Sequence, residues 1–95
     1  MISFTVRMTF RPDDREEISA ILRELTAASR QEPGCVSYIA HRVQSEPDTV
    51  VLYEQFRDQA ALDAHRAAPH FAIYAVGGLY QRMLARSVET LEALA

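Results

Sequence analysis

Three side chains that take up or release protons near neutral pH lie close together in the sequence, at Glu54, His65 and His70. Glu54 stands in the stretch Val50–Phe56, where alternate residues are apolar, so its carboxylate shares the strand face that should point to the core. A buried carboxylate must either find partners or keep its proton, and both outcomes suit acid–base chemistry. We therefore predict that Glu54 can act as a general base, with a pKa that burial raises toward roughly 6 to 7, while His65 is the other candidate for the base. The alternative is a structural carboxylate paired with Arg7 or with a backbone donor.

The two histidines are predicted to share this chemistry. His65 follows Ala61 and Leu62 on a short helix, so it can face a pocket, and the alternative is an exposed position on the helix surface. His70 comes directly after Pro69 and falls in the first turn of a second helix. The positive end of the helix dipole favours the neutral imidazole there, which suits a general acid, although the ring could also serve only as a cap or in packing.

A pocket for a planar substrate needs aromatic walls, and the sequence offers several aromatic side chains, although such residues more often belong to the core. The residues predicted to line the substrate pocket are Phe4, Arg7, His41, Phe56, Phe71 and Tyr74. His41 is expected to hydrogen-bond from the second strand to the third strand near Glu54. Tyr53 and Tyr38 fall on the faces opposite Glu54 and His41 respectively, and are predicted to contribute to a dimer interface.

Other kinds of chemistry have weaker signals. The spacing of the three histidines and Glu54 is not that of paired ligands on one helix or strand, so we predict no metal site. Cys35 follows a Pro-Gly turn without a nearby Lys or His in the sequence, so a nucleophilic role is not expected. There is no glycine-rich phosphate loop, and Gly77-Gly78 is interpreted as a hinge that ends a helix.

The elements that must position these residues follow from hydrophobic periodicity. Alternation from Ile2 to Phe10 predicts a strand that Pro12 ends, and Asp14 with Glu17 forms a capping box for a helix. The further predicted elements are that helix to about Gln31, strands over Cys35–Val43 and Val50–Arg57, and helices over Ala60–Arg66 and His70–Val76. The tail over residues 83–94 favours a helix by propensity, but a split βαβ sheet needs a fourth strand, so we predict a strand there.

Composition limits the class of protein. At 95 residues the chain is predicted to form one domain over residues 1–95. The net charge is -3 and the ten basic residues are all scattered arginines, so nucleic acid is not an expected partner. A single cysteine excludes an internal disulfide and fits a cytoplasmic location, and no apolar run has the length of a membrane span.

Four ordered segments resemble the antibiotic biosynthesis monooxygenase family. They are Glu32–Tyr38, Tyr53–Asp58, Ala61–His65 and Pro69–Phe71, and the similarity in order and spacing covers nearly the whole chain. The resemblance implies an α+β, ferredoxin-like split βαβ fold with a four-stranded antiparallel sheet. It also implies a homodimer in which the two sheets pack into an α/β barrel, with an apolar pocket between sheet and helices in each subunit.

The resemblance further implies oxidation of a quinol- or anthrone-like aromatic by O2 without a metal or flavin. Haem-degrading relatives ligate iron with a histidine a few residues past the position of Phe71, where this chain has Ala72–Ala75, so no cofactor is expected. Two alternatives remain open: an isomerase of a small carbonyl compound that uses the same acid–base set, and a dimer that binds a small molecule without catalysis.

Overall fold

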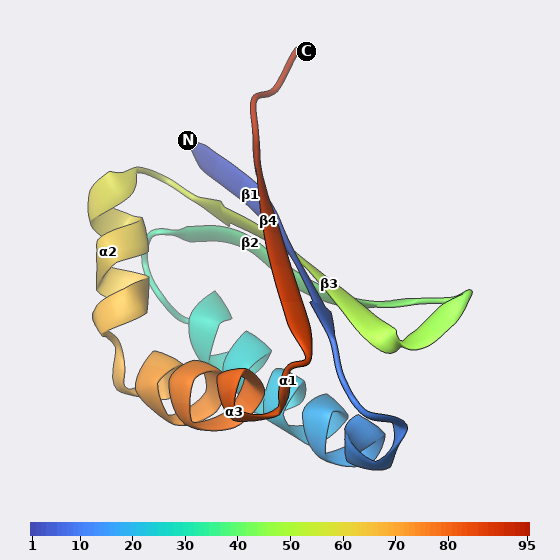
Figure 1. Cartoon of the computed structure of the whole chain (residues 1–95). Coiled ribbons are helices and arrows are strands. Elements are labelled where there is room, and N and C mark those ends of the chain that lie inside the picture. The colour runs from blue at the N-terminus through green and yellow to red at the C-terminus, as the bar shows by residue number, and fades with distance from the viewer.

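The computed structural model describes residues 1–95 and shows a four-stranded antiparallel sheet with its helices gathered on one face (Figure 1). The strands lie in the order β2-β3-β1-β4. In chain order the elements are β1 (Ile2–Thr9), a 3₁₀ turn η1 (Pro12–Asp14), α1 (Arg15–Arg30), β2 (Cys35–Val43), β3 (Glu46–Phe56), α2 (Gln59–Ala67), a π-helical segment η2 (Phe71–Leu79), α3 (Tyr80–Arg82) and β4 (Ala85–Leu91). This arrangement confirms the predicted ferredoxin-like α+β fold.

The two central strands, β1 and β3, place the site. They pair along the whole of β1, from Ile2 opposite Phe56 to Thr9 opposite Thr49, which sets Phe4 opposite Glu54. Directly paired residues point to the same face, so the alternating apolar residues of both strands enter one core. The buried core residues from these two strands are Phe4, Val6, Met8, Val50, Leu52 and Phe56.

The edge strand β2 corrects one prediction. Its register with β3 sets Tyr38 opposite Glu54, so the Tyr38 ring lies on the inner face, where the residue is only 2 % exposed. A residue buried in the core of its own chain does not face a partner, and the prediction that Tyr38 contributes to a dimer interface is wrong. Tyr53 lies half-buried on the other face of the sheet, as expected.

The N-termini of α1 and α2 are formed in different ways. The predicted N-cap of α2 is confirmed, because Asp58 Oδ1 accepts a hydrogen bond of 2.8 Å from the backbone N–H of Ala61. The capping box predicted for α1 is not formed: Asp14 makes no side-chain cap bond, and the chain instead enters the helix through η1. The helix itself covers the predicted residues and turns Ile18, Leu22 and Leu25 into the core.

The sequence predicted that Gly77 and Gly78 end the second helical segment, and this prediction is wrong. Helical structure continues from Pro69 through η2 and α3 to Arg82. A Cβ at Gly78 would lie 3.2 Å from Cγ2 of Ile21, so this glycine permits close packing of η2 on α1. Its role is therefore to provide space for a helix contact.

The C-terminal segment confirms the predicted strand. β4 pairs with β1, with Val88 opposite Val6, although Ala, Leu, Arg and Glu favour a helix by propensity. The free edge of β1 offers a row of backbone partners, which decides the structure of this segment. None of the helices combines the length and apolar character needed to cross a lipid bilayer.

Candidate functional site

Four titratable side chains meet between the sheet and the helices. Glu54 comes from β3, His65 from the last turn of α2, His70 from the residue before η2, and Glu32 from the connection between α1 and β2. Glu54 is 5 % exposed and His65 is 2 % exposed, so the pair lies within the core. The structure thus brings together the three residues predicted to be catalytic and adds a fourth.

The hydrogen bonds of His65 define its tautomer. Its Nδ1 lies 2.8 Å from Oε2 and 3.1 Å from Oε1 of Glu32. Because a carboxylate accepts, Nδ1 carries the hydrogen and donates it to Glu32. The lone pair on Nε2 then faces Glu54, whose Oε1 is 3.7 Å away. The second imidazole, of His70, donates from Nε2 to the same Glu32 carboxylate.

Burial changes the proton affinity of both inner groups. It raises the pKa of Glu54 to about 7, against a smaller lowering by the positive charges of Arg66 and Arg86 and a further small increase from the Glu32 charge. Burial also lowers the pKa of His65, and the hydrogen bond to Glu32 opposes that shift. Glu54 is therefore divided between its acid and base forms near neutral pH, beside a neutral imidazole.

Aromatic rings hold the His65 imidazole in place. The ring centroid of His65 lies 4.9 Å from that of Phe56, 5.2 Å from that of Phe71 and 5.8 Å from that of Tyr38. Burial raises the pKa of the Tyr38 phenol well above its ordinary value, so this hydroxyl stays protonated. The packing leaves the histidine one orientation, with one nitrogen toward each carboxylate.

The cavity beside these residues is small. Its volume of about 40 Å³ is close to that of a single water molecule and far below the few hundred Å³ of ordinary ligand pockets. Glu54, His65, Arg66 and Arg86 supply its charged lining, and the apolar lining includes Phe4, Tyr38, Leu62, Phe71 and Leu79. An aromatic substrate can enter only if side chains of this wall, such as Phe71 and Tyr80, move outward.

The predicted pocket residues divide into two groups. Phe4 and Phe71 line the cavity, and Phe56 packs on His65. Arg7, His41 and Tyr74 do not line it, and their assignment as pocket residues is corrected.

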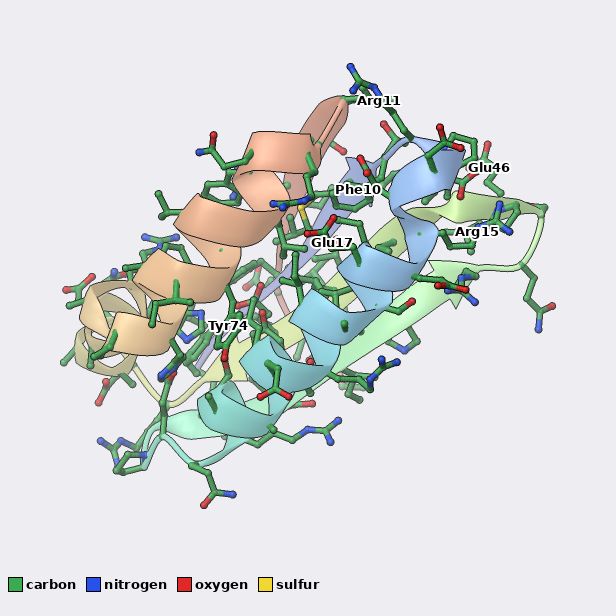
Figure 2. The ribbon with its side chains drawn as sticks, turned by 90° about the horizontal axis from the view of Figure 1, so that it is seen from below. Phe10, Arg11, Arg15, Glu17, Glu46 and Tyr74 are labelled. Atoms are coloured by element: carbon green, nitrogen blue, oxygen red, sulfur yellow. The ribbon has the colours of Figure 1, made fainter.

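Arg7 and His41 lie on the outer face of the sheet because they alternate with the inward-facing residues of their strands. Arg7 forms an ion pair with Glu46, and the His41 ring is 3.1 Å from the carbonyl oxygen of Val51. Tyr74 lies on η2 beside α1 (Figure 2), where it packs against the core. Arg7 is thus not the partner of Glu54.

Glu32 is the residue that sequence reasoning missed. It precedes Pro33-Gly34 in a turn, where a carboxylate has no periodic signal. The available signal is Gly34, because a Cβ at this glycine would lie 2.3 Å from Cβ of Ala61. The loop must therefore touch α2, and this contact places Glu32 beside His65. Arg66 and Arg86 carried no signal because they are exposed residues that meet the cavity only through the tertiary fold.

One group of side chains has the donor types of a metal site. Glu32, His65 and His70 offer three ligand atoms within 4.8 Å of one another. The same atoms are already hydrogen-bonded to each other in this structure. Burial raises the pKa of Cys35, the single cysteine of the chain, which disfavours the nucleophilic thiolate.

Comparison with known proteins places this chain in a family. The sequence profile of the antibiotic biosynthesis monooxygenase family matches residues 1–75. The chain belongs to this family. The matched range contains all four titratable residues of the site, Glu32, Glu54, His65 and His70, and ends within η2.

Individual proteins are also similar in sequence to this chain. The Mycobacterium tuberculosis protein named "Putative monooxygenase Rv0793" is 35 % identical over 89 residues, covering 92 % of this chain and 87 % of that protein. "Putative monooxygenase YcnE" of Bacillus subtilis is 30 % identical over 78 residues and is covered to 82 %, as is this chain. The uncharacterized protein sll1783 of Synechocystis is 38 % identical over 61 residues, but this match spans only 42 % of its length.

Solved structures share the fold over the whole chain. A crystal structure described as an antibiotic biosynthesis monooxygenase superposes with a TM-score of 0.92 at 28 % identity, covering 100 % of both chains. The structure of Rv0793 gives a TM-score of 0.88 at 29 % identity and covers 99 % of this chain and 95 % of the other. The family assignment and the fold therefore agree.

Proposed function

We propose that this protein is a cofactor-independent monooxygenase that oxidises a quinol- or anthrone-like aromatic with O2. The observation that carries the proposal is the buried chain of acid–base groups from Glu54 through His65 to Glu32, together with membership of a monooxygenase family. The substrate class comes from the family resemblance.

The reaction needs a base more than it needs a redox group. Ground-state O2 reacts slowly with closed-shell molecules, but a deprotonated quinol or anthrone readily gives up one electron. For an anthrone-like substrate, the reacting carbon loses two hydrogens and gains one oxygen atom of O2, while the other oxygen leaves as water with both hydrogens. The protein must remove the first proton, exclude bulk water and return a proton to the peroxide.

We propose one residue of the site for each of these tasks. Glu54 faces the cavity and accepts the substrate proton, which its pKa of about 7 permits at neutral pH. His65 Nε2 can relieve Glu54 of this proton, while Nδ1 passes its own proton to Glu32. The reverse transfer returns a proton to the peroxide and restores the first tautomer. Glu32 acts through His65 and is a positioning residue, and His70 holds its carboxylate from the outer side.

Oxygen uptake tests this proposal directly. We expect the protein to consume O2 with at least one of a panel of reduced quinols and anthrones, faster than each autoxidises in buffer. Glu54→Gln and His65→Ala should remove the acceleration. Glu46→Gln, which changes an exposed glutamate on the far side of the sheet, is the matched control and should retain it. Uptake at the autoxidation rate throughout the panel, or full activity in both site variants, contradicts the proposal.

The small volume of the cavity also supports a second candidate reaction, the isomerisation of a small carbonyl compound. A volume of about 40 Å³ needs less rearrangement to admit a small carbonyl compound than a polycyclic aromatic. The same base and acid could then move a proton between adjacent carbons, as an isomerase does. Product analysis under strictly anaerobic conditions separates the two reactions, since only the isomerase turns over without O2.

We also propose that the protein is a homodimer that packs its sheets face to face. The outer sheet face carries Ile39, which is 41 % exposed, with half-buried Val51 and Tyr53 beside it, and no helix covers this face (Figure 1). An uncovered apolar sheet face is a typical association surface. Static light scattering should give a dimer mass at micromolar concentration, and Tyr53→Arg should shift it toward the monomer. A monomeric wild-type protein contradicts this proposal.

A further inference from the structure

A larger hollow lies between α1 and the edge of the sheet. We name it the α1–β2 groove, and its volume is about 450 Å³. Its lining comes from one face of α1 between Arg15 and Arg30, from residues 39–42 of β2, and from Phe10, Pro47, Asp48 and Val50. We propose that this groove is a second binding site, which takes an amphipathic organic anion, with an apolar body and one carboxylate, sulfonate or phosphate group.

The groove has the size and shape of a small-molecule site. Its volume falls within the range of about 300–1,000 Å³ that is typical of ligand pockets. The lining residues of α1 recur every three or four positions from Arg15 to Arg30, so the groove follows the whole helix, a length of about 24 Å. Figure 2 shows one end, where Arg15 at the start of α1 faces the hairpin that carries Glu46.

The floor of the groove is apolar. Phe10, Ile18, Leu22 and Val50 supply it, and each of these residues is less than 9 % exposed. Their side chains belong to the core, so the floor is formed without a ligand. An apolar body in the groove would remove further hydrocarbon surface from water, a gain of about 25 cal/mol per Å².

The rim of the groove is cationic, although the whole chain carries a net charge of -3. Four of the ten arginines line it, and Asp48 is the one carboxylate among the lining residues. Asp48 is engaged by Arg15, with contacts of 2.8 and 3.2 Å. Arg23, Arg30 and Arg42 form no ion pair within the groove, and only Arg42 is close enough for the Asp48 charge to act on it.

Two of these guanidinium groups are held in place by neutral acceptors. Arg42 donates to Oγ of Ser19 over 3.1 Å, and Nε of Arg30 donates to the carbonyl oxygen of Tyr38 over 3.0 Å. Each contact uses one of the five N–H groups of an arginine, so donors remain for an anion. Positive charge without a paired carboxylate, above an apolar floor, complements an anion with a hydrocarbon body.

The groove is separate from the acid–base site. None of its lining residues belongs to the cavity that contains Glu54 and His65. It opens at the β2 edge between the sheet and α1, where Ile39 belongs both to its lining and to the outer sheet face. The site can therefore bind its ligand whether or not the protein is a monooxygenase.

Two matched fluorescent probes test the proposal. The first is 8-anilinonaphthalene-1-sulfonate, and the second is N-phenyl-1-naphthylamine, which has the same ring system without the sulfonate. We expect saturable binding of the sulfonate at one site per chain. The double variant Arg23→Ala, Arg42→Ala should weaken the sulfonate about tenfold and the neutral probe less than twofold, because only the first loses an ionic contact.

Two further variants control for net charge and for space. Arg11→Ala with Arg57→Ala removes the same charge from exposed positions outside the groove, and should leave both affinities within twofold. Ala27→Phe places a ring in the groove from an exposed helix position, and should abolish binding of both probes. Near-ultraviolet circular dichroism of each variant confirms that its core remains packed.

Backbone amide shifts then locate the bound sulfonate. They should change along α1 and over residues 39–42, and stay constant around His65. Shift changes centred on Glu54 and His65 overturn the proposal, as do unchanged sulfonate affinity in the double arginine variant or unchanged binding in Ala27→Phe. Shift changes that instead follow the backbone of β2 alone would show an edge-strand contact and also overturn it.

Discussion

The two hollows of this protein differ in almost every physical property. The cavity at Glu54 holds about 40 Å³ and is lined mainly by core side chains, whereas the α1–β2 groove holds about 450 Å³ and has a cationic rim. The small cavity contains the carboxyl group with a raised pKa, and the large groove contains arginines that stay charged at every physiological pH. The molecule therefore separates the place where protons can move from the place where volume is available.

The difference has a simple physical origin. A proton affinity shifts far only where water is excluded, which requires tight packing around the group. A preformed binding site needs space, which tight packing removes. Perturbation of the first region should therefore change rates and pH profiles, and perturbation of the second should change affinities.

The largest expected effect is the pH dependence of turnover. If Glu54 is the base, kcat/KM should rise on the order of 100-fold between pH 5 and pH 8, with a midpoint near 7, because the carboxylate form becomes populated over this range. In Glu54→Gln the residual rate should be flat with pH. Oxygen uptake at saturating O2 measures both, and a wild-type rate independent of pH would assign the base to another group.

A smaller effect is expected from Glu32→Gln. The amide oxygen still accepts from Nδ1 of His65 but takes up no proton, so kcat should fall about tenfold with KM nearly unchanged. Removing the negative charge of Glu32 should also move the pH midpoint of Glu54 downward, since that charge raises its pKa. Glu32→Asp should restore part of the rate. A loss of stability without any change in the pH profile would reduce Glu32 to a structural role.

The free energy of unfolding should also depend on the protonation of Glu54, and no substrate is needed to measure it. The folded-state pKa of Glu54 is raised, so its contribution to folding is complete below pH 4.5 and is lost as the pH rises through 7. Compared with Glu54→Gln, the wild-type protein should lose roughly 3 kcal/mol of unfolding free energy between pH 4 and pH 8. Urea denaturation at fixed protein concentration measures the difference, and parallel pH curves for the two proteins would contradict the raised pKa.

The smallest effects are expected where the two regions are predicted to be independent. Arg23→Ala with Arg42→Ala should leave O2 uptake within twofold, because neither arginine lines the Glu54 cavity. Treatment with a chelator should also leave uptake unchanged, and elemental analysis should find less than 0.1 metal per chain, on the order of adventitious binding. Activity that depends on added Zn²⁺ or Fe²⁺ would make Glu32, His65 and His70 a metal site.

Local patterns predicted the strands and helices well because period-two and helical spacing reflect a single face of burial. Alternation around Glu54 predicted a buried carboxylate, and Pro69 predicted a helix start near His70. The same local reasoning misplaced Tyr38 and His41, since the face of an edge strand depends on its register with the next strand. Glu32 was missed because its partner belongs to another element.

The close contact between Gly34 and Ala61 restricts which residues can stand at both positions. No glycine in the chain has a positive φ, so Gly34 is required only for space, and the space concerned is that of one methyl group against Ala61. The two positions share a single volume, and one methyl can occupy it from either side. Evolution could therefore exchange the two residues, with alanine at position 34 only where position 61 is glycine. Such paired replacement among relatives would trace the contact that places Glu32 beside the histidine.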